Sequence, residues 1–179
     1  MEAPADLDEL LDLLEESAAY DDEEAVDLLA HGLQCAAALA ETVPADLELQ
    51  VAGLVHDLGH VVSPGDDVGH PVTGAAAVAP LLGDRVAFLV RHHVDAKRWL
   101  VTHDPAYAKL LSPRSAQSLS VQGGVLTEVE LAALNHSHER EALIALRRAD
   151  DAAKVPGAVV PGLLSWLPVL RTVAGHQDG

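Results

Sequence analysis

Hydrophobic residues recur at intervals of three and four along most of this chain, the spacing that places them on one face of an α-helix. The clearest runs are Leu7, Leu10, Leu11 and Leu14, and then Val26, Leu29, Leu33 and Ala37. No stretch alternates with the period of two that is typical of a half-buried strand. The pattern therefore predicts an all-α fold.

Turn and capping residues divide this pattern into separate helices. The segment from Ser63 to Gly69 is a loop by composition, Thr127 begins a capping-box sequence, and Pro156 ends a long helical run. Pro105, Pro113 and the Gly123-Gly124 pair allow only short helices between residues 102 and 124. We expect helices over residues 7–14, 23–41, 45–58, 71–82, 84–100, 138–154 and 161–173, with a further one beginning at residue 127.

The charges are distributed unevenly along the 179 residues. The net charge is −17, and all 11 basic residues lie between Arg85 and Arg171, although 28 residues are acidic. Such a chain lacks the basic surface that a nucleic-acid-binding protein needs, and an anionic membrane would repel it. A single cysteine excludes a disulfide framework and a thiolate zinc site. Without a signal-peptide pattern or an apolar run of about 20 residues, we expect a cytoplasmic protein that contacts no membrane.

The adjacent residues His56 and Asp57 are the first candidates for chemistry. Both are good metal ligands, and the two oxygens of an aspartate can bridge two ions. The dipeptide alone is a weak signal, but His31 lies 25 residues before His56 and Asp150 lies 93 residues after Asp57, each on a predicted helix. A metal held by these residues would join helices that are remote in sequence.

Two further histidines extend the candidate set. His70 lies at the start of a predicted helix, and His93 lies on the next one. The six residues would suffice for two metal ions with Asp57 between them. Imidazoles with carboxylates favour iron, manganese or another borderline ion over calcium or magnesium. The proposed ligands are His31, His56, Asp57, His70, His93 and Asp150.

Helical spacing also places basic side chains beside these ligands. Lys97 follows His93 by four residues, and Arg147 precedes Asp150 by three. A pocket with metals, a lysine and an arginine suits a phosphate-like ligand, although both cations could simply offset the acids around them. On a continuous helix, His60 would share the face of the His56-Asp57 pair.

Two of the proposed ligands have neighbouring competitors. His92 competes with His93, but it lies five residues from Lys97 and would face elsewhere. Asp151 competes with Asp150, which we prefer because Arg147 lies on its face of the helix, as does Lys154.

Three stretches resemble the HD-domain phosphonate oxygenases, which are related to myo-inositol oxygenase. The first pairs His31-Gly-Leu-Gln34-Cys-Ala with His56-Asp57-Leu-Gly-His60, the second runs from His93-Val-Asp-Ala-Lys97 through residues 107–124, and the third covers residues 146–154. The resemblance covers about residues 20–157. It implies an HD-domain helical bundle, so we expect residues 1–179 to form a single HD domain with flanking N- and C-terminal helices.

The resemblance also implies an activity and a set of roles. Two iron ions, Fe(II)/Fe(III) in the active form, would be shared between His31, His56, Asp57 and Asp150 on one side and Asp57, His70 and His93 on the other. O2 would be used to cleave the C–P bond of a 1-hydroxyphosphonate, 2-amino- or 2-trimethylammonio-substituted, with release of phosphate. A separate hydroxylase would make this substrate. The implied substrate-binding residues are Glu24, His60, Lys97, Ser115, Gln122 and Arg147.

One departure from the family and two alternative functions remain. The family has a tyrosine and a glutamate before the first histidine; Tyr20 lies four residues before Glu24 where three are expected. A metal-dependent HD phosphohydrolase would use the same six ligands. The context of Lys97, Gln122 and Arg147 favours the oxygenase. The complete ligand set argues against a non-enzymatic regulatory module.

Overall fold

Polar side chains at the N-termini determine where several helices begin. The carboxylate of Asp27 accepts a hydrogen bond from the amide of Ala30 at 2.8 Å, and that of Asp46 accepts one from Leu49 at 3.1 Å. These contacts satisfy amides that have no partner within the helix. Thr127 forms the expected capping box. The starts of α2, α3 and α7 are therefore determined by short-range hydrogen bonds.

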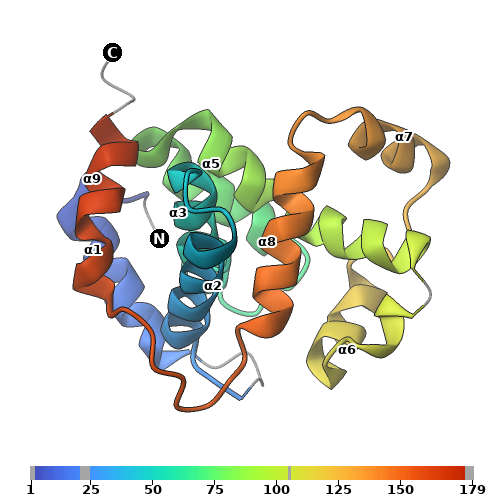
Figure 1. Cartoon of the computed structure of the whole chain (residues 1–179), viewed down its shortest axis with the longest axis horizontal. Helices are drawn as coiled ribbons and strands as arrows, with labels where there is room; N and C mark the ends of the chain where they lie inside the picture. The colour runs from blue at the N-terminus through green and yellow to red at the C-terminus, as the bar shows by residue number, and fades with distance from the viewer. Residues whose placement is uncertain (1–2, 21–24, 105, 176–179) are drawn as a thin grey trace.

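The computed structural model describes residues 3–20, 25–104 and 106–175. In these ranges the regular elements are all helical (Figure 1). They are α1 (Leu7–Glu16), η1 (Ser17–Ala19), α2 (Leu28–Thr42), α3 (Leu47–Val55), α4 (Gly59–Val62), α5 (His70–His103), η2 (Tyr107–Lys109), α6 (Pro113–Val121), α7 (Glu128–His136), α8 (Arg140–Ala152), η3 (Leu163–Trp166) and α9 (Leu167–Gly175). The predicted all-α class is confirmed.

Three predicted helices have different bounds in the structure. The helix expected over residues 161–173 is instead the short 3-10 helix η3 followed by α9, which begins at Leu167. The helix expected from residue 23 begins at Leu28, because Asp27 is its N-cap; residues 21–24 lie outside the described ranges. The helix expected over residues 45–58 ends at Val55. A turn over residues 56–58 and the short α4 follow it. This break is important for the site, since it falls on the His56-Asp57 pair.

The core lies where α2, α3, α5 and α8 pack together, as the centre of Figure 1 shows. Each helix contributes fully buried aliphatic side chains, for example Leu39, Val55, Leu89 and Leu146. Burial of a leucine or valine side chain stabilises a fold by about 1.5–3 kcal/mol. The apolar faces of these helices are thus buried against one another, chiefly through the pairs α2–α3, α2–α8, α3–α5 and α5–α8, and the residues next to this core are held in fixed positions.

Helix α5 consists of two helical halves joined at Gly83. This residue has φ 85° and ψ 173°, a conformation that favours glycine, and it separates the two helices expected over residues 71–82 and 84–100. By length and composition alone α5 could cross a membrane. The kink interrupts it, however, and Val78, Val86 and Val90 on its two halves are fully buried in the core.

Arg85, two residues after the kink, links α5 to the N-termini of α3 and α8. Its guanidinium donates to the carboxylate of Asp46 at 2.7 and 2.8 Å and to that of Glu139 at 2.9 and 3.0 Å. The hydrogen bonds from Arg85 lower the pKa of Asp46, the N-cap of α3. These paired contacts hold the start of the second half of α5 against the N-termini of α3 and α8.

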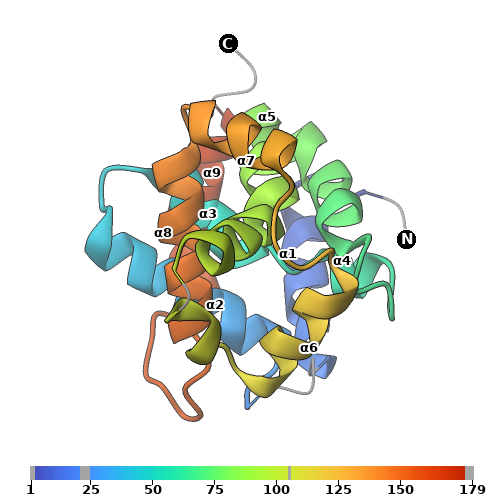
Figure 2. The ribbon, with the colours of Figure 1, turned by 90° about the vertical axis from the view of Figure 1, so that its right-hand side faces the viewer.

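Helices α6 and α7 lie at one end of the molecule, on the right in Figure 1 and facing the viewer in Figure 2. Arg98 on α5 holds this end: it donates to the carboxylate of Glu130 at 2.7 Å and to the carbonyl of Gly124 at 3.1 Å. Helix α7 and the loop between α6 and α7 are therefore held against α5.

Gly59 provides a test of the packing between α4 and α5. A Cβ at this position would lie 1.9 Å from the carbonyl oxygen of His70, so Gly59→Ala must force the two helices apart. We expect a loss of about 1–3 kcal/mol in the free energy of unfolding, measured by urea denaturation. Gly162→Ala is the matched control, because nothing lies within 4 Å of its Cβ. Equal stability of the two variants would contradict the close contact.

Candidate metal centre and anion pocket

Four buried imidazoles meet where α2, α3 and the two halves of α5 converge. His31 lies in α2, His56 is the C-cap of α3, His70 is the first residue of α5, and His93 lies in its second half. All four are at most 5% exposed. Their Nε2 atoms approach in pairs, with 3.3 Å between His31 and His56 and 3.2 Å between His70 and His93.

The other nitrogen of every imidazole is bound to the backbone. Each Nδ1 lies 2.7–2.9 Å from a carbonyl oxygen, and these oxygens belong to Ala153, Gly53, Asp67 and Val90. A carbonyl can only accept, so each Nδ1 carries the proton and the Nε2 of a neutral ring carries a lone pair. Hydrogen bonds of this kind are the usual support of a metal-binding histidine.

Asp57 lies between the two pairs of rings. Its Oδ2 is 3.3 Å from the Nε2 of His56 and 3.6 Å from that of His31. Its Oδ1 is 3.6 Å from the Nε2 atoms of both His70 and His93. One carboxylate thus directs one oxygen to each pair, the arrangement of an aspartate that bridges two ions.

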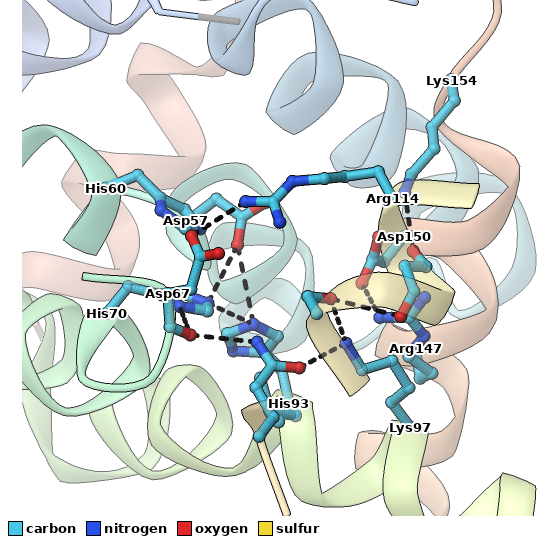
Figure 3. A pocket seen from close by; sticks show the side chains of 14 residues that line it. Asp57, His60, Asp67, His70, His93, Lys97, Arg114, Arg147, Asp150 and Lys154 are labelled. Carbon is cyan, nitrogen blue, oxygen red and sulfur yellow. Dashed lines mark hydrogen bonds and ion pairs between the residues drawn. The ribbon is translucent and has the colours of Figure 1, made fainter. Parts of the chain in front are cut away.

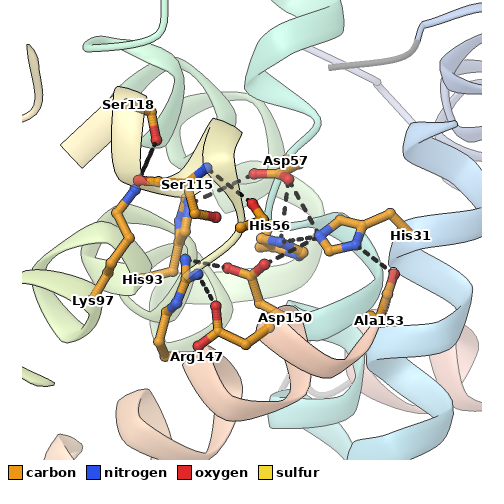
Figure 4. Close-up of polar contacts among 12 residues, drawn as sticks. His31, His56, Asp57, His93, Lys97, Ser115, Ser118, Arg147, Asp150 and Ala153 are labelled. Carbon is orange, nitrogen blue, oxygen red and sulfur yellow. Dashed lines mark hydrogen bonds and ion pairs between the residues drawn. The ribbon is translucent and has the colours of Figure 1, made fainter. Parts of the chain in front are cut away.

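Asp150 completes the first group from α8. Its Oδ1 lies 3.4 Å from the Nε2 of His31, and its Oδ2 accepts from Arg147 at 2.6 Å (Figure 4). Arg147 also donates to Asp151 and, through Nε, to the hydroxyl of Tyr107 at 2.9 Å. Tyr107 in turn donates to Asp151 at 2.6 Å. A fixed network therefore sets the orientation of the Asp150 carboxylate.

The result is two compact sets of potential ligand atoms. The first consists of His31, His56 and Asp150, and the second of Asp57, His70 and His93; within each set the ligand atoms lie within 4.8 Å of one another. A bound metal accounts for this arrangement better than contacts within the protein do. In the second set the two facing Nε2 atoms are both acceptors 3.2 Å apart, and a bound cation would accept both lone pairs. These residues can therefore hold metal.

The charges of the cluster agree with this fit. Burial opposes the ionisation of Asp57 and Asp150, but the facing imidazoles and Arg147 outweigh it and hold both pKa values well below the usual range. Burial lowers the pKa of His70 to about 4, so that ring is neutral at pH 7. Burial also disfavours a charged His56, yet Asp57 and Asp150 raise its pKa to about 9. A metal bound there would replace this proton.

A pocket opens directly beside the second set of ligands (Figure 3). Its wall carries basic side chains from three helices: Lys97 on α5, Arg114 on α6 and Arg147 on α8, with Lys154 just after α8. Lys97 is only 2% exposed, and its ammonium donates to Ser118 at 3.0 Å and to Gln122. A pocket of this kind suits a small anion with several oxygen atoms.

The structure places most of the residues proposed to bind substrate around this pocket. His60, Lys97, Ser115, Gln122 and Arg147 all line it. His60 does so although the expected continuous helix is broken before it; its ring stacks on that of His70 with centroids 4.0 Å apart. Glu24 lies outside the described residues.

The competing residues lie elsewhere. His92 turns away from the cluster and bonds Asp95 at 2.7 Å, and Asp151 is engaged by Tyr107 and Arg147. Tyr20 packs against the hydrophobic core and is not among the described residues that line the pocket.

Sequence reasoning did not single out Arg114, Asp67 or Ser118 as site residues. Ser118 follows Ser115 by three residues on α6, so helical spacing alone could have indicated it. Arg114 and Asp67 carry no such signal. Asp67 belongs to the loop before α5, and only the folded chain brings it to within 2.8 Å of Arg114.

An imidazole and carboxylate cluster drawn from helices far apart in sequence is the defining feature of one helical family. The HD-domain model matches residues 29–151, and the chain belongs to the HD-domain family. The chain is also similar to two relatives whose names state an activity. The chain is 36% identical to a hydroxymethylphosphonate dioxygenase of Gimesia maris over 177 residues, 94% of this chain and 88% of that protein. It is 30% identical to a [1-hydroxy-2-(trimethylamino)ethyl]phosphonate dioxygenase (glycine-betaine-forming) of Leisingera caerulea over 164 residues, 87% and 83% of the two chains.

Substitution of the shared carboxylate tests the metal centre. We expect Asp57→Ala to bind metal at least about tenfold more weakly than the wild type, because even partners of metal ligands contribute this much to affinity. His93→Ala removes a ligand from one set only, so it should weaken metal binding less than Asp57→Ala does. Metal content after equilibrium dialysis, measured by mass spectrometry, gives the comparison. His138→Ala, at an exposed histidine, is the control. Unchanged metal content in Asp57→Ala would contradict the assignment.

Proposed function

We propose that this protein is an O2-dependent diiron oxygenase that cleaves the C–P bond of a 1-hydroxyphosphonate and releases phosphate. The observation that carries the proposal is the pairing of two metal-binding sets with a cationic pocket against one of them. Both relatives described above carry the name of a phosphonate dioxygenase, which supports the same class of reaction.

The metal that fits this activity is iron, with two ions per chain. His31, His56 and Asp150 would hold one ion, His70 and His93 would hold the other, and Asp57 would contribute one oxygen to each. Iron in these positions would supply the redox chemistry with O2 and would acidify a substrate hydroxyl. The protein itself orients the imidazoles through the backbone carbonyls that accept from each Nδ1, so that each Nε2 faces the centre of the cluster.

The overall reaction balances without a further reductant. A 1-hydroxyphosphonate, R–CH(OH)–PO₃²⁻, reacts with one O2 to give the carboxylate R–COO⁻ and phosphate, with one added oxygen atom in each product. The C–P bond breaks, and O2 accepts four electrons. Because the substrate already carries the hydroxyl, a separate hydroxylase acting on the parent phosphonate would precede this enzyme.

The residues of the pocket would bind and orient the phosphonate. The ammonium of Lys97 is held by Ser118 and Gln122, so it is fixed before substrate enters and needs no reorganisation. Ser115 accepts from Lys154 at 3.2 Å and would present its hydroxyl to a phosphonate oxygen. Arg147 would add positive charge while it holds Asp150. His60 and the second metal-binding set form the remaining wall.

Reconstitution with iron tests the proposed reaction. Protein loaded anaerobically with Fe(II) and partly oxidised should give a low-temperature EPR signal of a mixed-valent pair, and a hydroxyphosphonate should perturb it. Admission of O2 should release phosphate from that substrate, with one phosphate formed per O2 consumed. Phosphate release from a phosphate ester or a nucleotide without O2 would instead indicate a phosphohydrolase and would overturn the proposal.

Lys97 should give the substrate affinity a pH dependence. Burial, together with the neighbouring Arg147, lowers the pKa of Lys97 to about 8. Below this pH the ammonium attracts the phosphonate, and above it the charge is lost, so KM should rise as the pH increases through 8. A charge-assisted hydrogen bond is worth about 1.5–3 kcal/mol, so Lys97→Ala should raise KM at pH 7 by about tenfold to a hundredfold.

Two variants complete this experiment. Lys97→Arg keeps its charge at every pH of the assay and should abolish the rise in KM above pH 8. Arg148→Ala removes an exposed charge on α8, outside the pocket lining, and should leave KM unchanged. The iron content of Lys97→Ala should equal that of the wild type. Loss of iron in that variant would mean that Lys97 supports the metal centre rather than the substrate.

A further inference from the structure

Arg114 reaches into the pocket from the start of α6. Its guanidinium donates to the carboxylate of Asp67 at 2.8 Å, and its side chain is 13% exposed. Figure 3 shows this side chain extended across the pocket toward Asp57 and Asp67, with Lys97 on the opposite side in that view. Arg114 therefore forms part of the wall next to the metal-binding residues.

Asp67 is held in place by contacts of its own backbone. Its carbonyl oxygen lies 2.9 Å from Nδ1 of His70 and accepts from Nε2 of Gln122 at 3.1 Å. The same residue thus orients a metal-binding imidazole, fixes the amide that holds Lys97, and positions the guanidinium of Arg114. The Arg114–Asp67 pair is consequently a built part of the pocket rather than a loose surface contact.

The charges on the pocket wall are unfavourable for a cation. The acidic side chains among the described lining residues are Asp57, Asp67 and Asp150. Asp57 and Asp150 face the imidazoles, and Asp67 is paired with Arg114. The same described wall contains no tryptophan, tyrosine or phenylalanine, the residues that bind quaternary ammonium groups. Among the described lining residues, an ammonium group would meet basic side chains and carboxylates that already face an imidazole or an arginine.

We infer that Arg114, positioned by Asp67, determines the substrate specificity of this site by excluding hydroxyphosphonates whose second carbon carries an ammonium group. The substrates that remain are hydroxymethylphosphonate and its uncharged homologues. This inference rests on the proposed function and names the substrate class within it. In the proposed function Lys97 and its partners bind the phosphonate. Arg114 lines the same small pocket from the opposite side in Figure 3, so a positive substituent on a bound substrate would lie near its guanidinium.

Binding measurements without O2 test this inference separately from catalysis. Fe(II)-loaded protein under argon is titrated calorimetrically with hydroxymethylphosphonate, 1-hydroxypropylphosphonate and 2-amino-1-hydroxyethylphosphonate. The last two ligands have nearly the same shape, but only one carries a positive charge. We expect the wild type to bind the propyl compound about tenfold more tightly than the amine, as like charges a few ångströms apart repel by more than 1 kcal/mol at low effective permittivity.

Variants of Arg114 and Asp67 test whether this pair causes the preference for the uncharged ligand. Arg114→Met should bring the two dissociation constants within about twofold of each other, whereas Arg114→Lys should keep the preference because it keeps the charge. Asp67→Asn should increase the preference, since it leaves the charge of Arg114 uncompensated. Arg91→Met, at an exposed arginine of α5, changes the net charge equally and should behave as the wild type.

Three outcomes would overturn the inference. The first is tighter binding of the amine than of the propyl compound by the wild type. The second is an equal loss of affinity for all three ligands in Arg114→Met, which would show that Arg114 holds the phosphonate. The third is an unchanged preference in that variant. If the proposed function is wrong, the protein will bind hydroxymethylphosphonate but will release no phosphate when O2 is admitted.

Discussion

The structure depends on one electrostatic constraint: buried imidazole nitrogens with lone pairs face one another around the Asp57 carboxylate. The facing Nε2 atoms of His70 and His93 are both acceptors and lie 3.2 Å apart, an arrangement that a bound metal ion would satisfy. Burial keeps His70 neutral, and the backbone carbonyls fix the tautomer of each ring. The orientation of the cluster is therefore set by backbone carbonyl oxygens, those of Gly53 near the end of α3, Asp67 in the loop before α5, Val90 within α5 and Ala153 at the end of α8.

This constraint explains the less regular parts of the fold. Helix α3 ends at Val55, and the turn that follows allows His56 and Asp57 to face the same point. The first residue of α5 is itself a metal-binding candidate, and Gly59 allows α4 to pack directly against its backbone. On the far side, Arg147 holds Asp150 and is held in turn by Tyr107 and Asp151. The helical core positions these groups, and the polar network orients them.

The sequence was sufficient for the features that depend on local spacing. Apolar periodicity predicted the helices, and the capping box at Thr127 is present as expected. The start of α2 at Leu28 was predicted wrongly, because the capping hydrogen bond of Asp27 outweighed the apolar pattern around it. The Arg114–Asp67 pair could not be predicted, since 47 residues separate its members and a loop conformation brings them together. Local rules thus predict helices and helix faces, whereas loop contacts require the tertiary structure.

The net charge of −17 is compatible with an anionic substrate because charges act over short distances. At physiological ionic strength exposed charges are screened beyond about 8 Å, so the acidic residues on the outer surface affect the pocket weakly. Inside the pocket, Lys97 and Arg147 are almost fully buried and are screened much less. The carboxylates nearby face the metal-binding imidazoles or, at Asp67, an arginine. The field that a substrate meets is consequently set by the few basic residues of the wall, all of them from the half of the chain after Gly83, and not by the sum over the sequence.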